Sequence, residues 1–300
     1  MGDKVKSEPT QAVLEPVEVR ERLWKIKLNQ SKGNIRIGVV KKHAQANSLF
    51  LEINGARRFE IGNDCDTCHF WFKCLRDPRP APHKKLFNLP KTIALPRPID
   101  AEMVRELLPM LDIMEKGEYY LMNTTVALTG PYQADDESSY FHNSEFQEIW
   151  DIEDPASEDF LSDWEHYEGK TPKVFRHEDV LEKLHEFVIP LVPGNRLKQE
   201  NIRLYQQMIQ NGDRPRIFLL GLIQRPIPES VTARRSKTMH SFFAGFVLDG
   251  HHKLAAYQRA GLPANCLVLV STKASKYFLL DDEGSDAHMR LEERLAALAV

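Results

Sequence analysis

Hydrophobic and polar residues alternate in the N-terminal part of the chain, and this pattern predicts β-strands. The alternating stretches are Ile35–Val40, Leu49–Ile53 and Arg58–Ile61. Asn54-Gly55 stands between the second and the third of them, and Asn-Gly in that position is the strongest short signal for a β-hairpin. We therefore expect a hairpin that turns at Asn54-Gly55.

A helical pattern follows over residues 99–116, with Asp100 as the expected N-cap. One face carries the apolar residues Met103, Leu107, Leu108 and Leu111, although Pro109 interrupts the pattern. Tyr119–Leu128 then predicts a strand. Together these elements predict an N-terminal α+β unit over residues 31–135, preceded by a flexible arm over residues 1–30.

Residues 136–170 combine acidic and aromatic side chains, with Trp150, Phe160 and Trp164 among many carboxylates. Such a segment can bind a basic partner or mimic nucleic acid. The commoner interpretation, which we favour, is a solvated connector whose aromatic residues pack on a neighbouring domain.

The remaining residues, 171–300, predict a second α+β domain. It begins with a helix over Asp179–Phe187 and a short strand over Val188–Val192. The further expected elements are a helix over Glu200–Gln210, a strand over Ile217–Ile223, a strand over Phe246–Leu248, a helix that ends at Gly261, a strand over Cys266–Val270 and an amphipathic C-terminal helix. The predicted fold class of the whole chain is therefore α+β.

Composition describes an ordinary globular chain. The 300 residues are 42% hydrophobic and 28% charged, and the formal net charge is −3. This charge provides no global attraction to nucleic acid or to an anionic membrane. No apolar run is long enough for a membrane span, and the N-terminus lacks the apolar core of a signal peptide. We expect a cytoplasmic protein with reduced thiols and no membrane partner.

Three of the four cysteines lie close together, at Cys65, Cys68 and Cys74. Because zinc takes four thiolate or imidazole ligands in a tetrahedron, these cysteines with His83 or His69 make a candidate Zn²⁺ site on a knuckle hairpin. The pattern lacks a second Cys-x2-Cys pair. The alternative is that the cysteines fill an aromatic core beside Phe70, Trp71 and Phe72.

The strongest candidate for chemistry is Asp249-Gly250-His251-His252-Lys253, where an apolar strand stops and a helix begins. The start of a helix presents backbone N–H groups and a positive dipole end, which together favour a phosphate. We expect Gly250, His252 and Lys253 to hold nucleotide phosphates and Asp249 to bind Mg²⁺ or accept a proton. The loop carrying Arg234 and Arg235 is expected to close over the site. The alternative interpretation is structural, with Asp249 as a helix cap and the histidines on the surface.

This order of elements and the Asp-Gly-His-His-Lys motif resemble the ParB/sulfiredoxin superfamily over about residues 187–271. The resemblance implies a nucleotide-binding α+β domain. Sulfiredoxins have a nucleophilic cysteine where this chain has His251, so sulfinic acid repair is not expected. ParB proteins carry a different motif followed by a helix-turn-helix region, for which the residues after Ser271 are too few, so DNA binding is not favoured.

The motif looks most like the branch that contains free serine kinases, and this resemblance adds a glutamate base, for which Glu200 is the nearest candidate. The expected catalytic residues are thus Asp249, His251 and Glu200. The expected function is nucleotide-dependent phosphoryl transfer to a small-molecule acceptor, or nucleotide hydrolysis, with ATP or another nucleotide and Mg²⁺. The alternative is a non-catalytic nucleotide sensor or adaptor whose N-terminal unit binds a protein partner or a second copy of the chain.

Overall fold

The structure is a computed structural model of the chain, and its fold is mixed α/β, with one large mixed sheet and few helices. This architecture is compatible with the predicted α+β class. The structure describes residues 17–20, 22–41, 47–63, 70–74, 89–132, 166–177, 180–192, 194–224, 238–275 and 285–299.

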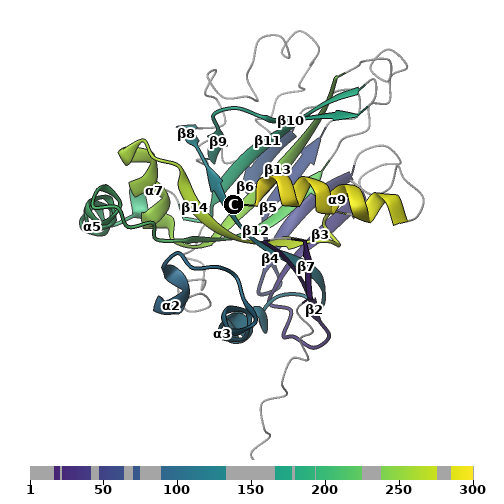
Figure 1. The fold of residues 1–300 in the computed structure, drawn as a ribbon, viewed down its shortest axis with the longest axis horizontal. Coiled ribbons are helices and arrows are strands. Elements are labelled where there is room, and N and C mark those ends of the chain that lie inside the picture. The colour runs from purple at the N-terminus through teal and green to yellow at the C-terminus, as the bar shows by residue number, and fades with distance from the viewer. Residues whose placement is uncertain are drawn as a thin grey trace, which may run out of the picture.

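A ten-stranded sheet forms the centre of the described chain (Figure 1). Its strands in spatial order are β1 (Val17–Arg20), β2 (Leu23–Leu28), β7 (Gly117–Val126), β14 (Ala264–Ser271), β12 (Ile217–Gln224), β13 (Thr238–Asp249), β11 (Val180–Pro190), β9 (His166–Gly169) and β8 (Leu128–Tyr132), and β10 (Lys173–His177) also pairs with β11. The pairs β11/β13 and β12/β14 are parallel. The other pairs are antiparallel, so the sheet is mixed.

Both faces of this sheet are covered, and residues alternate between them. In β14, Leu267 and Leu269 face a core shared with α3 (Ala101–Leu111), while Cys266, Val268 and Val270 face a core on the opposite side. Three helices cover that opposite side: α5 (Gln199–Gln210), α7 (His251–Ala260) and α9 (Ser285–Leu298). Burial on both faces explains why β12 and β14 are almost continuously apolar.

A second, four-stranded antiparallel sheet contains β3 (Ile35–Lys41), β4 (Asn47–Ile53), β5 (Ala56–Asn63) and β6 (Phe70–Cys74). Asn54 and Gly55 have φ values of 52° and 77°, as the tight hairpin between β4 and β5 requires. The predicted hairpin is confirmed. Apolar residues of this sheet, such as Ile37 and Leu51, belong to the same core as α3.

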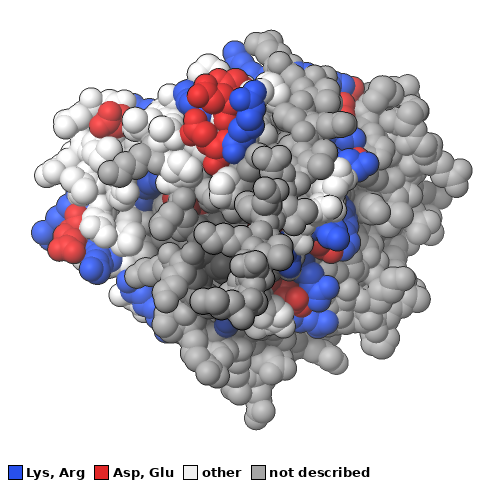
Figure 2. All heavy atoms as spheres, turned by 90° about the horizontal axis from the view of Figure 1, so that it is seen from below, with Lys and Arg blue, Asp and Glu red and all other residues white. Residues whose placement is uncertain are grey.

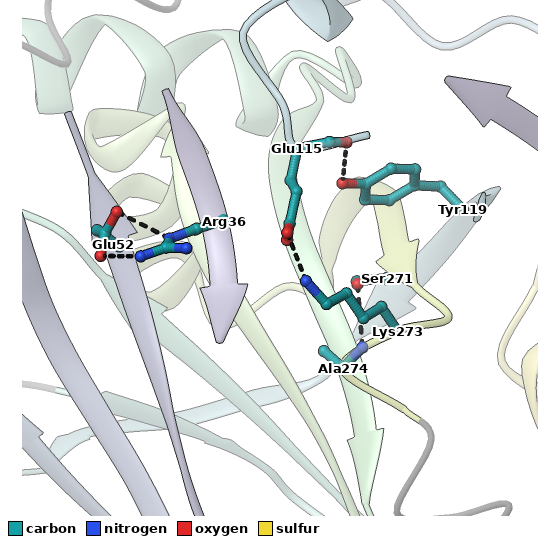
Figure 3. A network of polar contacts seen from close by, with 7 residues as sticks. All are labelled: Arg36, Glu52, Glu115, Tyr119, Ser271, Lys273 and Ala274. Atoms are coloured by element: carbon teal, nitrogen blue, oxygen red, sulfur yellow. Dashed lines mark hydrogen bonds and ion pairs between the residues drawn. The ribbon is translucent and has the colours of Figure 1, made fainter. Parts of the chain in front are cut away.

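Glu115 joins the small sheet to the rest of the molecule, and Figure 3 shows its contacts with Tyr119 and Lys273. Its backbone N–H donates to the carbonyl of Ile35 at 2.8 Å, and its own carbonyl accepts the Tyr119 hydroxyl at 2.7 Å. The Lys273 ammonium, from the turn after β14, pairs with its carboxylate. This junction connects β3, the end of the α3 region and β14.

The predicted helix over residues 179–187 is wrong, because Val180–Pro190 forms strand β11. Apolar residues in this stretch have helical spacing, but in the strand Glu182 and Glu186 share the covered face with Leu184. Arg294 of α9 pairs with Glu182 at 2.6 Å, whereas the Lys173 ammonium of β10 lies 3.7 Å from the Glu186 carboxylate. A pattern of hydrophobic residues alone cannot identify a strand whose buried face includes charged residues.

The N-terminal elements also differ from expectation. Residues 17–28, which fall within the predicted arm, contain β1 and β2, and β2 pairs with β7 in the large sheet. The helix expected over residues 99–116 is α3, and the Met103 N–H donates to the Asp100 carboxylate at 2.7 Å, which confirms the cap. A short helix α2 (Lys91–Ala94) precedes it.

Figure 2 views the molecule from the side on which α2 and α3 lie in Figure 1, and basic and acidic side chains are interspersed over the described surface. One ion pair of the described residues joins Arg97 and Glu106 at 2.9 Å. Among the described residues, no helix has both the length and the apolar character needed to cross a membrane.

Candidate functional site at the start of α7

Gly250 shapes the candidate site, because the chain reverses there between β13 and α7. It has a φ of 101° and a ψ of 24°, in the left-handed region that favours glycine. A Cβ atom at this position would lie 3.2 Å from the Cα of Ile217. Gly250 is the N-cap of α7, and no side chain caps the helix there. The predicted glycine turn is thus confirmed. The N-terminal end of α7 has no side-chain cap.

The site lies where two parallel strands end together. Pro190 of β11 is aligned with Val247 of β13, so the carboxyl ends of both strands lie side by side. β11 leads to α5 through a short 3₁₀ helix over Gly194–Arg196, and β13 leads directly into α7. In α/β sheets, ligands bind preferentially outside the carboxyl ends of parallel strands.

The two histidines of the motif bind the segment that leaves β11. The Nε2 atom of His251 accepts the N–H of Leu191 at 3.0 Å, and that of His252 accepts the N–H of Lys198 at 3.2 Å. His251 is buried and His252 is half-buried. In both bonds the ring nitrogen is the acceptor and the backbone N–H is the donor.

Lys253 points into the protein. Its ammonium donates to the backbone carbonyl of Arg216 at 2.8 Å and lies 3.6 Å from the Asp249 carboxylate and 5.8 Å from the centre of the Tyr205 ring. Only 7% of its side chain is exposed. Burial lowers the pKa of Lys253, and the charge of Asp249 opposes this effect. In this conformation the ammonium contacts groups inside the protein. A lysine that binds a phosphate would be expected to extend toward solvent.

Asp249 is partly accessible, with 27% of its side chain exposed. Burial raises its pKa, while Lys253, the Gly250 N–H and the charge of His252 act in the opposite direction. The pKa of Tyr205 is also raised, first by burial and then by Asp249. Groups with perturbed pKa values that gather at one place are typical of functional sites, although structural ion pairs produce the same effect. We call Asp249, Lys253, Tyr205 and His252 the Asp249 cluster.

The other predicted site residues are less closely involved. Glu200 lies in the first turn of α5 with 76% of its side chain exposed, and its carboxylate is 4.0 Å from the Lys198 ammonium. Arg234 and Arg235 lie outside the described residues.

The proposed zinc ligands Cys65, Cys68, His69 and His83 also lie outside the described residues, and Cys74 ends β6. At about 3.3 Å per residue, β6 places the Cα atom of Cys74 about 13 Å from that of Phe70, where the strand begins. The loop that holds Cys65 and Cys68 enters at Phe70, so a site shared with Cys74 requires this loop to fold back along the strand. The described residues contain no group of three or more potential metal ligands.

Sequence reasoning did not find Arg216, which lies beneath the Asp249 cluster at the start of β12. Its carbonyl accepts the Lys253 ammonium, and its guanidinium donates to the Ile93 carbonyl at 3.3 Å and to the Arg97 carbonyl. Burial, and then the charge of Arg97, lower its pKa to about 10. Arg214 and Arg216 both stand directly before an apolar strand, and no periodic pattern indicates that the side chain of Arg216 is buried.

Comparisons with known proteins add no further assignment. No protein-family model matches the chain, and neither a curated protein nor a solved structure matches it.

Proposed function

We propose that the chain binds a nucleotide through its phosphates at the start of α7 and is a nucleotide-dependent phosphotransferase or nucleotide hydrolase. The observation that carries this proposal is the left-handed Gly250, which opens α7 without a side-chain cap at the joined ends of β11 and β13. Backbone N–H groups at such a helix start are suited to hold a phosphate. The resemblance of residues 187–271 to the ParB/sulfiredoxin superfamily supports the proposal, and the order β11-α5-β12-β13-α7-β14 agrees with it.

The residues have different proposed roles. The first turn of α7 holds the phosphates, and Asp249 faces them with its partly exposed carboxylate. Mg²⁺ is commonly bound by one or two carboxylates and substrate phosphates, so Asp249 fits the position of a Mg²⁺ ligand and the ion would neutralise phosphate charge. Glu200 is the proposed base for an acceptor hydroxyl, and Arg234 and Arg235 are the proposed covering cations. Lys253 and the two histidines hold the start of α7 in place through their hydrogen bonds to the backbone of Arg216, Leu191 and Lys198.

Two variants at His252 test the phosphate site with a matched control. Both Gln and Glu can accept the Lys198 N–H, but Glu adds a negative charge at the helix start, where it repels a phosphate. We expect ATP, ADP or CTP, with or without Mg²⁺, to raise the melting temperature of the wild type and of His252→Gln, but not that of His252→Glu.

The proposal is wrong if none of these nucleotides stabilises the wild type, or if His252→Glu responds as strongly as His252→Gln. Turnover measured with a panel of hydroxyl amino acids separates the two reactions. Hydrolysis releases inorganic phosphate without an acceptor, whereas transfer consumes the nucleotide only when the acceptor is present and leaves the phosphoryl group on it. Binding without any turnover favours the alternative function, a nucleotide sensor or adaptor.

We also propose that the loop between β5 and β6 holds Zn²⁺ through Cys65 and Cys68, with His69, His83 or Cys74 completing the set. The support is that this loop joins two paired antiparallel strands, which is the setting of a zinc knuckle. We expect purified wild type to contain about one zinc ion per chain and Cys65→Ser/Cys68→Ser to contain none. Equal zinc content in the two proteins, measured by elemental analysis, would exclude the site.

A further inference from the structure

The outer face of the small sheet carries two arginines that share one aromatic ring. Because Ile37 and Leu51 face the core shared with α3, the residues that alternate with them in β3 and β4 face outward. On that outer face, the guanidinium carbons of Arg36 and Arg57 lie 5.8 Å and 4.2 Å from the centre of the Phe50 ring. We propose that this group binds carboxylates on an acidic segment of a partner protein. The proposed site is independent of the nucleotide site at α7.

Gly38 makes room for the shared ring. It lies directly opposite Phe50 in the pairing of β3 with β4. A Cβ atom at Gly38 would lie 2.3 Å from the Cζ atom of Phe50, so any other residue at this position would push the ring away. Phe50 is only 5% exposed, although it lies outside the two apolar cores. The ring is therefore held over Gly38 and offers the two guanidinium groups a fixed support.

Glu52 neutralises one of the two arginines. It stands between Arg36 and Arg57 in the strand register, and its carboxylate accepts the Nε and Nη2 groups of Arg36, both at 2.8 Å (Figure 3). Arg57 is exposed, and the described residues place no carboxylate within ion-pair distance of it. A guanidinium stacked on a ring keeps its N–H donors at its edge, in the fork geometry that matches a carboxylate. The stack also reduces the side-chain entropy that binding would cost.

The number and spacing of the cations favour an acidic peptide over nucleic acid. Sequence-independent binding of nucleic acid depends on many cations along a surface, whereas this group has two, one of which is already paired. Arg36 and Arg57 stand on the strands at either side of β4, so their backbones are about 10 Å apart. Side chains two residues apart on one side of an extended peptide are about 7 Å apart. Because both guanidinium groups lean toward one ring, two such carboxylates can reach them together.

Fluorescence anisotropy tests the site on the full-length protein, with a labelled peptide in which glutamate alternates with serine. We expect the wild type to bind this peptide, and to bind the same peptide with glutamine in place of glutamate at least about tenfold more weakly. Arg57→Lys keeps the charge but cannot form the stacked fork, and Gly38→Ala keeps both arginines but displaces the ring. Each of these variants should weaken the binding of the acidic peptide about tenfold.

Arg203→Gln is the matched control, because Arg203 is an exposed arginine on α5, which covers the other face of the large sheet, and this variant should bind as the wild type. The proposal is overturned if the wild type does not bind the acidic peptide, or if Arg57→Lys and Gly38→Ala bind it as tightly as the wild type. Tighter binding of an oligothymidine would overturn it in favour of nucleic acid. If Gly38→Ala does not fold, Phe50→Leu replaces it, since this variant removes the ring and leaves both charges, and it should show the same tenfold loss.

Discussion

At the scale of single residues, the main feature of this protein is the placement of charged side chains in its interior. Lys253, Arg216, Glu182 and Glu186 are all buried, and backbone carbonyls or an ion pair with a residue distant in the sequence compensate the first three. Burying a charge is costly unless it is paired or hydrogen-bonded, so these positions are sensitive to substitution and to pH.

Glu186 illustrates this sensitivity. Its nearest described cation is Lys173, whose ammonium lies 3.7 Å from Oε1, longer than a hydrogen bond, and Oε1 has no hydrogen-bond partner. Burial raises the pKa of Glu186, and Lys173 opposes this shift. A carboxyl group with a raised pKa in the folded state binds its proton more tightly there than in the unfolded state. Its contribution to stability is therefore present at low pH and is lost as pH rises through the folded pKa.

We accordingly expect Glu186→Gln to stabilise the protein by about 1 kcal/mol at neutral pH and by less at about pH 4. Urea unfolding at the two pH values measures the difference. A variant that loses more stability at neutral pH than at the lower pH would show that the Lys173 pair outweighs the burial of the carboxylate.

At the scale of elements, α9 is attached to the sheet by a buried ion pair. Arg294 of α9 contacts Glu182 of β11 at 2.6 Å, with exposed side-chain fractions of 2% and 0%, and the Ser241 hydroxyl donates to the other carboxylate oxygen at 2.7 Å. About one turn later, at the last residue of the helix, the Thr124 hydroxyl of β7 donates to the Leu298 carbonyl. These contacts anchor α9 across the sheet from β7 to β11.

Removal of one partner of this pair should be far more harmful than removal of both. We expect Arg294→Met to cost about 3–5 kcal/mol, because Glu182 would remain buried without its cation, and Glu182→Met/Arg294→Met to recover much of this loss. Thermal and urea unfolding compare the variants. Lys25→Met, which breaks the partly exposed pair with Glu118 at 3.1 Å, is the control and should change stability by less than about 1 kcal/mol. An equal loss in the single and double variants would contradict the role of the pair.

Most elements could be predicted from local patterns. The β4–β5 hairpin, α3, α5, α7 and the strands β12 and β14 follow the expected positions within a few residues. Strand β11 does not, because two of its core-facing positions are glutamates. At the candidate site, Gly250 and the start of α7 were predictable from Asp-Gly followed by a helical pattern. The acceptor role of the histidines and the inward direction of Lys253 were not, because their partners are 37 to 60 residues away in sequence.

At the scale of the whole molecule, one sheet includes strands from both predicted halves. Strand β7, from the expected N-terminal unit, pairs with the full length of β14 of the expected C-terminal domain, for example Met122 with Val268. β2 then extends the sheet beyond β7. The boundary expected near residue 135 therefore does not separate two sheets.

A fragment over residues 171–300 should consequently fail to fold cooperatively. It would lack β7 and α3, which would open the hydrogen-bonding edge of β14 and expose its Leu267 and Leu269 face. We expect no cooperative thermal transition in circular dichroism. In contrast, the full chain cleaved at a site inserted within residues 136–165 should keep its two parts together in size-exclusion chromatography. A stable fragment with a melting temperature like that of the full chain would contradict this interpretation.

Sequence by itself determined the mixed helix and strand content, the hairpin at Asn54-Gly55 and the glycine turn that opens α7, because these depend on local periodicity and backbone conformation. Only the tertiary structure decided that β11 is a strand, that β2 and β7 share a sheet with β14, and that His251, His252 and Lys253 turn toward the protein. Each of these outcomes depends on pairing between distant segments. Hydrogen bonds and ion pairs of that kind leave no periodic trace in the chain.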